Sequence, residues 1–285
     1  MRYQIKIAHP LSSFPFELKG VVACYQNEVT PFALDLILKL ADSFFVYVHN
    51  DDEDNDEAEL AAGGCLGTIK RILGSKLSQE GYHKALDILL PLFNYCFSEK
   101  AGDTFIEEGM GCFNCILTNM NELSEKIWHY YLVFNYIIAG KPKNIPINID
   151  LSSLPEEKKL IYEENDSGWG PEHIEHMIGA LQNYVYKGKG LLLQAKDPGF
   201  GLTYLELLFK SIERVYEVNK EDGDDVHVTI ASTLFIAILE NCVGLIDNIV
   251  PLIMEKCVFL LNSKFQENTF KKVLVQTVDA DCVLF

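Results

Sequence analysis

Residues 31–48 read PFALDLILKLADSFFVYV, and this stretch decides the type of fold. Its apolar side chains recur at every third or fourth position, which is the period of an amphipathic α-helix. They are Ile37, Leu40, Ala41, Phe44, Phe45 and Val48. Pro31 suits the first turn of such a helix, where its missing N–H would have no partner in any case. The sequence therefore predicts a helix over residues 31–48.

The same spacing returns nine more times, whereas the alternating pattern of β-strands is scarce. Pro91 should kink the third helix because it removes one backbone donor, and Ser124 should cap the fifth. The further helices are expected near residues 61–73, 80–97, 105–120, 124–140, 171–185, 202–218, 230–242, 245–260 and 270–281.

The ten helices group into five antiparallel pairs, whose first helices start near residues 31, 80, 124, 202 and 245. A period of about 40–47 residues is the signature of two-helix HEAT repeats. One interval is longer, because residues 141–170 are rich in proline and end in Asn-Asp-Ser-Gly, as expected for an insertion loop. Each pair needs its neighbours to bury its apolar stripe. We therefore predict an all-α fold, a right-handed α-solenoid of about five HEAT-type antiparallel helix pairs, in a single domain over residues 1–285.

Both ends of the chain suggest a segment of a longer solenoid. Residues 5–24 have the pattern of a helix whose pair partner is missing, and the chain ends in a helical stripe. Cys282-Val283-Leu284-Phe285 has the form of a prenylation box, but the acidic residues before it favour a truncated helix. No signal-peptide core and no apolar run of membrane-spanning length is present, so we expect the protein in the cytoplasm and nucleus.

The charge balance restricts the partners. The chain carries 24 basic and 41 acidic side chains, a formal net charge of −17. Such a surface repels nucleic acid phosphates and anionic membranes, and it attracts basic proteins over a long range. Nucleic acid and membranes are therefore not expected as partners.

Three acidic segments are candidate sites. The first, Asp51 to Glu59, could hold Lys- or Arg-rich segments through many weak contacts, or it could be only a solvated loop. The second, Glu221 to Asp225, should supply the N-cap of the next helix. The third runs from Glu163 to Trp169. There Trp169, beside carboxylates, could anchor a basic peptide, or it could pack the loop against the solenoid. The candidate residues for binding basic cargo are Asp51, Asp52, Glu53, Asp54, Asp56, Glu57, Glu59, Glu163, Glu164, Asp166 and Trp169.

Residues for catalysis, cofactors or metals are not indicated. Cys112 and Cys115 form a lone C-x-x-C without further ligands, and we interpret them as core residues. His173 and His176 are expected at the surface. The chain contains no Gly-x-Ser-x-Gly, Walker or dinucleotide motif, so we predict no enzyme activity and no cofactor.

Residues 31–45, PFALDLILKLADSFF, resemble the importin-β (karyopherin-β) family, in particular its importin seven/eight-like branch. The runs Gly64-Cys65-Leu66-Gly67-Thr68-Ile69, Ile127-Trp128 with Leu132-Val133-Phe134, and Tyr204-Leu205-Glu206 extend this resemblance over most of residues 20–285. It implies a HEAT-repeat nuclear import receptor that binds basic cargo on an acidic inner surface and releases it when Ran-GTP binds. The Ran-binding elements of the family lie in amino-terminal repeats that have no match here, so direct Ran contact by this segment is not expected. The alternative is a HEAT scaffold subunit of a kinase or phosphatase complex.

Overall fold

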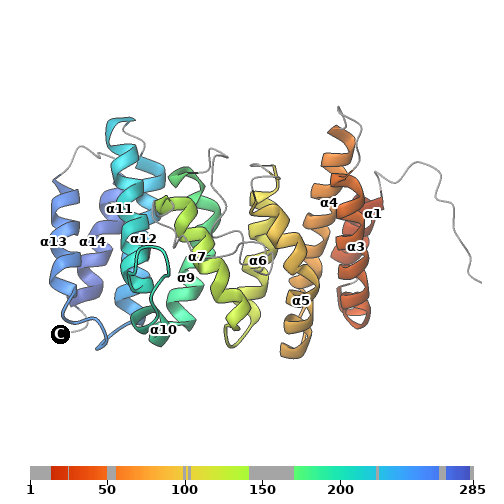
Figure 1. Ribbon diagram of the computed structural model, residues 1–285, viewed down its shortest axis with the longest axis horizontal. Coiled ribbons are helices and arrows are strands. Elements are labelled where there is room, and N and C mark those ends of the chain that lie inside the picture. Colours follow the sequence, from red (N-terminus) through yellow and green to blue (C-terminus); the bar gives the residue numbers. More distant parts are fainter. Residues whose placement is uncertain are drawn as a thin grey trace, which may run out of the picture. The chain divides into compact units, whose positions relative to one another are not determined.

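The computed structural model describes residues 14–24, 26–49, 56–98, 101, 104–140, 170–222, 225–262 and 268–282. In these ranges every regular element is helical, apart from an isolated bridge between Lys196 and Thr203 (Figure 1). The predicted all-α class is therefore confirmed. The chain divides into two compact units, unit 1 (Met1–Met120) and unit 2 (Asn121–Phe285).

All four helices predicted between residues 31 and 120 form in unit 1. Pro31 lies in a 3₁₀ turn directly before the first of them, as its preference for a first turn predicts. The elements of the unit are α1 (Phe14–Cys24), α2 (Gln26–Val29), η1 (Thr30–Phe32), α3 (Ala33–Val48), α4 (Asp56–Leu73), α5 (Gln79–Cys96) and α6 (Ile106–Asn119).

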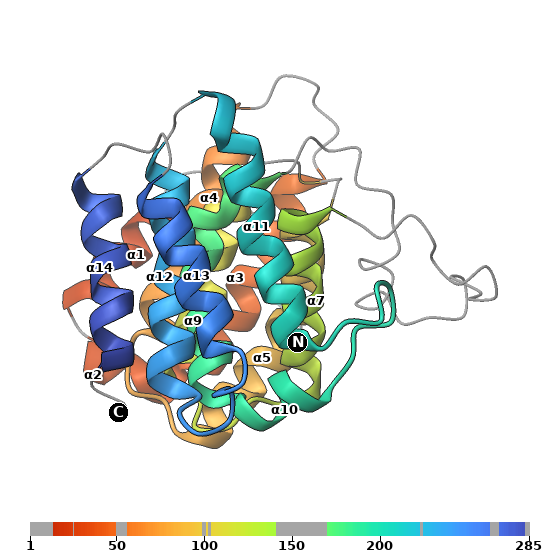
Figure 2. The ribbon, with the colours of Figure 1, turned by 90° about the vertical axis from the view of Figure 1, so that its left-hand side faces the viewer.

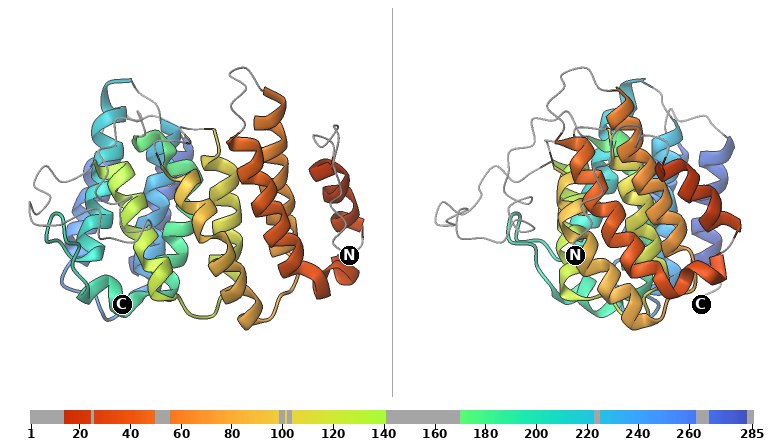
Figure 3. Two further views of the ribbon diagram at one scale, coloured as in Figure 1. Left: turned by 45° about the vertical axis from the view of Figure 1, so that its right-hand side comes forward. Right: turned by 90° about the vertical axis from the view of Figure 1, so that its right-hand side faces the viewer.

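Unit 1 is a stack of helix pairs. Helix α3 packs against α4 and α5 against α6, while α3 also contacts α5 and α4 also contacts α6. Figure 3, in which the unit runs from red to yellow, shows α3 and α4 side by side. Each pair is thus covered by the next, which is the solenoid type of packing. Helix α1 lies against α4, the second helix of the next pair, just as α4 contacts α6. The expectation that residues 5–24 form a helix without its pair partner stays a prediction, since residues 1–13 lie outside the described residues.

The predicted stripe of α3 faces the core. Ile37, Leu40, Ala41 and Phe44 are each at most 4% exposed, whereas Phe45 and Val48 are only half-buried. Burial of one such large aliphatic or aromatic side chain contributes roughly 1.5–3 kcal/mol. The stripe is therefore the main reason why this helix forms where it does.

Small residues let other elements approach α4 closely. The Thr68 hydroxyl donates to the carbonyl oxygens of Pro15 (2.9 Å) and Gly64 (2.8 Å), which ties α1 to α4. At Gly67 an added Cβ would lie 3.2 Å from Nζ of Lys19. The Gly-x-Leu-Gly-Thr run of α4 therefore has a packing role.

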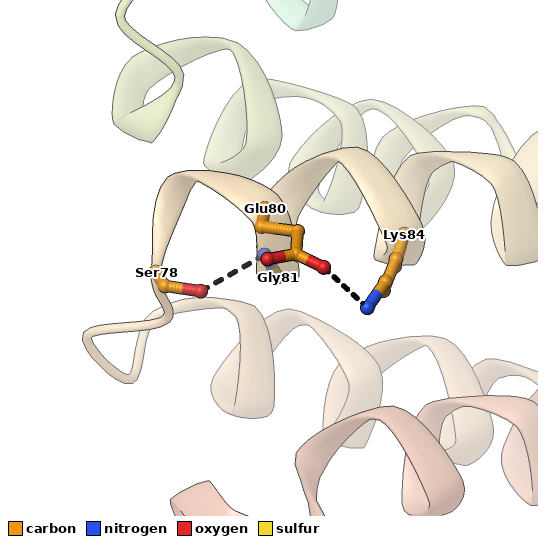
Figure 4. A network of polar contacts seen from close by, with 4 residues as sticks. All are labelled: Ser78, Glu80, Gly81 and Lys84. Carbon is orange, nitrogen blue, oxygen red and sulfur yellow. Dashed lines mark hydrogen bonds and ion pairs between the residues drawn. The ribbon is translucent and has the colours of Figure 1, made fainter.

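Helix α5 begins at a side-chain cap (Figure 4). Ser78 Oγ accepts a hydrogen bond from the Gly81 N–H at 3.0 Å, which satisfies one of the unpaired donors of the first turn. In the same first turn, Glu80 pairs with Lys84 at 2.6 Å on the exposed face, and this hydrogen bond lowers the pKa of Glu80. The helix then continues through Pro91 to Cys96.

The six remaining predicted helices form in unit 2, within a few residues of their expected bounds. A short additional helix, α10, precedes the predicted turn at residues 197–199. The elements are α7 (Glu125–Ala139), η4 (Pro171–His173), α9 (Ile174–Lys187), α10 (Lys189–Gln194), α11 (Tyr204–Asp222), α12 (Asp225–Asn241), α13 (Val250–Leu261) and α14 (Asn268–Cys282).

Unit 2 has the same stacked organisation. Its pairs are α7 with α9, α11 with α12 and α13 with α14. Between pairs, α7 contacts α11, α9 contacts α12, and α12 contacts α14. Figure 2 shows α12 beside both α9 and α14. The helix-pair stacking predicted from the repeat period is therefore confirmed inside each unit, whereas a single solenoid over residues 1–285 stays a prediction.

An aromatic cluster forms the centre of unit 2. The rings of Trp128, Tyr131, Tyr184 and Tyr204 lie with centroids 5.1–5.7 Å apart, the range preferred by aromatic pairs. The Tyr131 hydroxyl donates to the Tyr204 carbonyl at 2.6 Å, so its polar end is satisfied despite burial. This cluster joins α7, α9 and the start of α11.

Buried Asp197 organises the loop between α10 and α11. Its carboxylate is 2% exposed and accepts hydrogen bonds from the Tyr136 hydroxyl at 2.7 Å and from the backbone N–H groups of Gly199, Phe200 and Leu202 at 2.7–3.0 Å. A buried charge is tolerated when it is hydrogen-bonded in this way. The predicted turn at residues 197–199 is thus confirmed, with a role for Asp197 that the sequence did not indicate.

Two local expectations are wrong. Ser124 occupies the N-cap position of α7, but its side chain caps no backbone N–H. His173 and His176 are mostly buried, with side chains 12% and 25% exposed, because η4 packs against α7 and α11 and α9 packs against α7. Among the described residues, no helix combines the length and the apolar character needed to cross a bilayer.

Candidate functional site

Three of the predicted acidic residues lie in the first turn of α4. Asp56, Glu57 and Glu59 are all exposed there. Their carboxylates lie close to the amino-terminal end of the helix dipole, which favours negative charge. The other candidates lie outside the described residues: Asp51, Asp52, Glu53, Asp54, Glu163, Glu164, Asp166 and Trp169.

Asp56 and Glu59 line a surface hollow of ≈ 420 Å³ in unit 1, which we call the α4–α6 hollow. Glu108 from α6 joins them, whereas Glu57 does not line the hollow. An added Cβ at Gly63 would meet nothing within 4 Å, so this part of the surface is open. The lining residues are Lys19, Asp56, Glu59, Leu60, Gly63, Gly64, Thr104, Phe105 and Glu108.

Stacking explains why Glu108 joins the two predicted residues. Helices α4 and α6 are the second members of successive antiparallel pairs, so their first turns lie at the same end of unit 1 (Figure 1). Glu107 and Glu108 stand in the first turn of α6, as Asp56 and Glu59 do in that of α4. The repeat period together with acidic first turns could have indicated Glu108 from the sequence.

The α4–α6 hollow is predominantly negative. Three carboxylates face one lysine, Lys19, which comes from α1. A surface with this balance attracts cationic side chains, with each exposed pair contributing little by itself. The arrangement can therefore bind a segment with several Lys or Arg residues better than a single one.

The C-x-x-C pair belongs to the core, as predicted. Cys112 is fully buried, and its thiol donates to the Leu66 carbonyl at 3.3 Å, while Cys115 is partly buried. Burial raises the pKa of both thiols and so disfavours the nucleophilic thiolate. In the described part of the chain, no group of three or more His, Cys, Asp or Glu side chains could hold a metal ion.

The acidic turn near residue 223 is only partly described. Helix α11 ends at Asp222 and α12 begins at Asp225, so the break between the two helices stands at the predicted place. The N-cap position itself lies outside the described residues. The capping role of this segment therefore stays a prediction.

An apolar groove of ≈ 620 Å³ lies between α11 and α13 in unit 2. Phe209, Leu245 and Leu252 are among its lining residues, and an ion pair between Glu213 and Lys256 at 3.3 Å crosses its rim. The sequence did not indicate this groove, because its walls come from segments more than 30 residues apart that meet only after folding.

One comparison with known proteins gives a clear match. The chain is 26% identical to an importin beta-like SAD2 homolog from Arabidopsis thaliana over 267 residues, which cover 92% of this chain and 22% of that protein. The chain thus spans about a fifth of the length of this relative. No family model and no solved structure matches the chain.

The similarity and the fold agree with each other. The match extends over nearly the whole chain, and within each unit the helices stack pair on pair, as in helical-repeat proteins. The importin seven/eight-like branch stays a prediction. The chain is therefore related to the importin-β family, as the resemblance of residues 31–69 predicted.

Proposed function

We propose that this chain is part of a nuclear import receptor and that it binds basic cargo proteins through its acidic surface. The observation that carries the proposal is the meeting of Asp56, Glu59 and Glu108 in the α4–α6 hollow. The similarity to an importin beta-like protein and the net charge of −17 support the same function. In the full-length protein, Ran-GTP would release the cargo, without direct contact by this segment.

Titration with a lysine-rich peptide tests this function. We expect a fluorescently labelled basic peptide, such as a histone tail, to bind the chain at low salt and to bind more weakly at physiological salt. The reason is that the Debye length falls from about 30 Å at 0.01 M to about 8 Å at 0.15 M. A glutamate-rich peptide of the same length is the control. Absence of salt-dependent binding to the basic peptide would refute the proposal.

A matched pair of variants tests the place of binding. Asp56→Asn, Glu59→Gln and Glu108→Gln combined should weaken binding by roughly tenfold, since each exposed ion pair contributes about 0.2–1 kcal/mol. The control variant removes the same number of negative charges from exposed positions of α3 and α5. It combines Asp35→Asn, Asp42→Asn and Asp87→Asn. If both variants lose peptide affinity equally, only the overall charge of the chain attracts the peptide.

Affinity purification separates the proposal from its alternative. Bait consisting of the chain should recover basic proteins from a cell extract, and a longer form of the protein should also recover Ran. Recovery of a kinase or phosphatase, with neither Ran nor basic proteins, would instead favour a HEAT scaffold in an enzyme complex.

A further inference from the structure

A second hollow, here called the α9–α12 hollow, lies between α9 and α12 in unit 2 and measures ≈ 470 Å³. Clefts that hold small ligands or side chains have volumes of roughly 300–1,000 Å³. Figure 2 shows the two helices next to each other. The lining residues are Gly179, Gln182, Asn183, Tyr186, Thr233, Ile236, Ala237, Glu240 and Asn241.

Tyr186 presents an aromatic ring in this hollow. Its side chain is 62% exposed, whereas Tyr184, two positions earlier, is fully buried in the aromatic cluster. Within the described residues, Tyr186 has neither a hydrogen bond nor a ring partner. An exposed ring of this kind can receive a cation on its face.

Among the described residues, Glu240 is the only charged one that lines the α9–α12 hollow. Some exposed glutamates are engaged within the protein: Glu80 pairs with Lys84, and Glu206 accepts from the hydroxyl and the N–H of Thr203. Glu240 is exposed and forms no ion pair with any described residue. Its carboxylate is therefore available to a partner.

Two amide side chains of the hollow each use one N–H on another atom of the protein. Asn241 donates to the Ala237 carbonyl at 2.8 Å, and Gln182 donates to the Thr233 hydroxyl at 3.1 Å. The groups that can receive a cationic N–H donor here are the amide oxygens of Asn241 and Gln182 and the Glu240 carboxylate, together with the Tyr186 ring. Acceptors, an aromatic face and one carboxylate complement a group that is cationic and rich in N–H donors.

We infer that the α9–α12 hollow binds a lysine or arginine side chain of a protein partner, between the Tyr186 ring and the Glu240 carboxylate. The inference rests on the proposed binding of basic proteins and adds a site in unit 2 to the α4–α6 hollow in unit 1. Each unit thus offers one site for a basic side chain.

Substitution of Tyr186 tests the aromatic part of the site. With a labelled lysine-rich peptide, Tyr186→Ala should bind about two- to fivefold more weakly, because an exposed cation–π contact is lost. Tyr186→Phe keeps the ring and should bind like the unmodified chain. Phe259→Ala is the matched control, because Phe259 is a similarly exposed ring (66%) on α13, away from the hollow.

Substitution of Glu240 tests the charged part. Glu240→Gln should weaken peptide binding and reduce its salt dependence, whereas Glu255→Gln, which removes an exposed carboxylate of α13, should change binding less. All variants change exposed side chains, and unchanged circular dichroism and melting curves should confirm that they fold.

The outcomes distinguish this inference from the proposed function. If the unmodified chain binds the peptide while Tyr186→Ala and Glu240→Gln bind equally well, the α9–α12 site is wrong and the function stands. Equal weakening by Glu240→Gln and Glu255→Gln would also overturn the site, because it would reflect the overall charge. If the unmodified chain does not bind any basic peptide, both the function and the site are refuted.

Discussion

At the scale of single residues, close packing decides which glycines are required. Gly188 has an ordinary backbone conformation, with φ −112° and ψ 19°, so its need for glycine does not come from left-handed geometry. An added Cβ would lie 2.2 Å from the ring of Trp128 and 2.8 Å from the Tyr184 carbonyl oxygen. The aromatic cluster of unit 2 therefore leaves no space for a side chain here.

Gly188→Ala should destabilise the protein by about 1–3 kcal/mol, the usual effect of overpacking a core. The change in the free energy of unfolding can be measured by urea denaturation. Gly190→Ala is the control, because a Cβ there would meet nothing within 4 Å and Gly190 lies within α10. This control should be neutral or slightly stabilising, and an equal loss in both variants would contradict the packing argument.

Burial of a titratable side chain also acts at the residue scale. Burial raises the pKa of Cys65 in α4 to about 12 and that of Cys257 in α13 to about 11. In the unfolded chain the thiols ionise near pH 8.5. Between these values the folded state holds more protons than the unfolded state, so the stability present at lower pH is lost as pH rises.

Cys65→Ala should therefore make stability depend less on pH in this range. The unmodified chain should lose up to about 1.4 kcal/mol per pH unit for each such thiol between about pH 8.5 and 11. Urea denaturation at about pH 8 and about pH 10 measures the slope. Leu66→Ala, a neighbouring core variant, should lower stability equally at both pH values, and a Cys65→Ala slope equal to that of the unmodified chain would contradict the prediction.

At the scale of helices, the same residue type has different effects at two helix starts. Ser78 and Ser124 both occupy the N-cap position, of α5 and α7 respectively. Only Ser78 accepts a hydrogen bond from a backbone N–H of its helix. A cap stabilises a helix only when its side chain satisfies such a donor. The position in the sequence is thus insufficient to identify a working cap.

Ser78→Ala should cost about 1 kcal/mol of stability, because it removes the acceptor for the Gly81 N–H. Ser124→Ala should be neutral or slightly stabilising, since the Ser124 hydroxyl is buried with no hydrogen-bond partner among the described residues. Thermal and urea denaturation of both variants against the unmodified chain provide the measurement. A larger loss for Ser124→Ala than for Ser78→Ala would contradict this assignment of caps.

At the scale of the whole molecule, the net charge of −17 opposes folding as well as attracting partners. Like charges on a compact surface repel one another, and salt screens this repulsion. We expect the melting temperature to rise by about 2–4 °C between low and physiological salt, which corresponds to about 1 kcal/mol for a protein of this size. A melting temperature that falls with added salt would show that attractive ion pairs outweigh the repulsion.

The sequence by itself determined the helices and their pairing. Residues such as Ile37, Leu40 and Phe44 recur with the helical period, and this local pattern is sufficient because a helix satisfies its own backbone hydrogen bonds. Turn signals such as Asp197-Pro198-Gly199 placed the breaks. The repeat interval and residues 31–69 then predicted the relationship to importin-β proteins, which the similarity to a relative confirms.

Only the tertiary structure decided which surface residues meet. Glu108 lines one hollow with Asp56 and Glu59, and Tyr186 lines another with Glu240, because stacked helices bring together positions about 50 residues apart in the chain. The same stacking brings α1 against α4, buries most of His173 and places Gly188 against Trp128. Periodicity specifies which face of a helix is buried. Which exposed side chains of neighbouring helices lie close together depends on the distance and the angle between successive helix pairs. No local sequence pattern encodes that distance or angle.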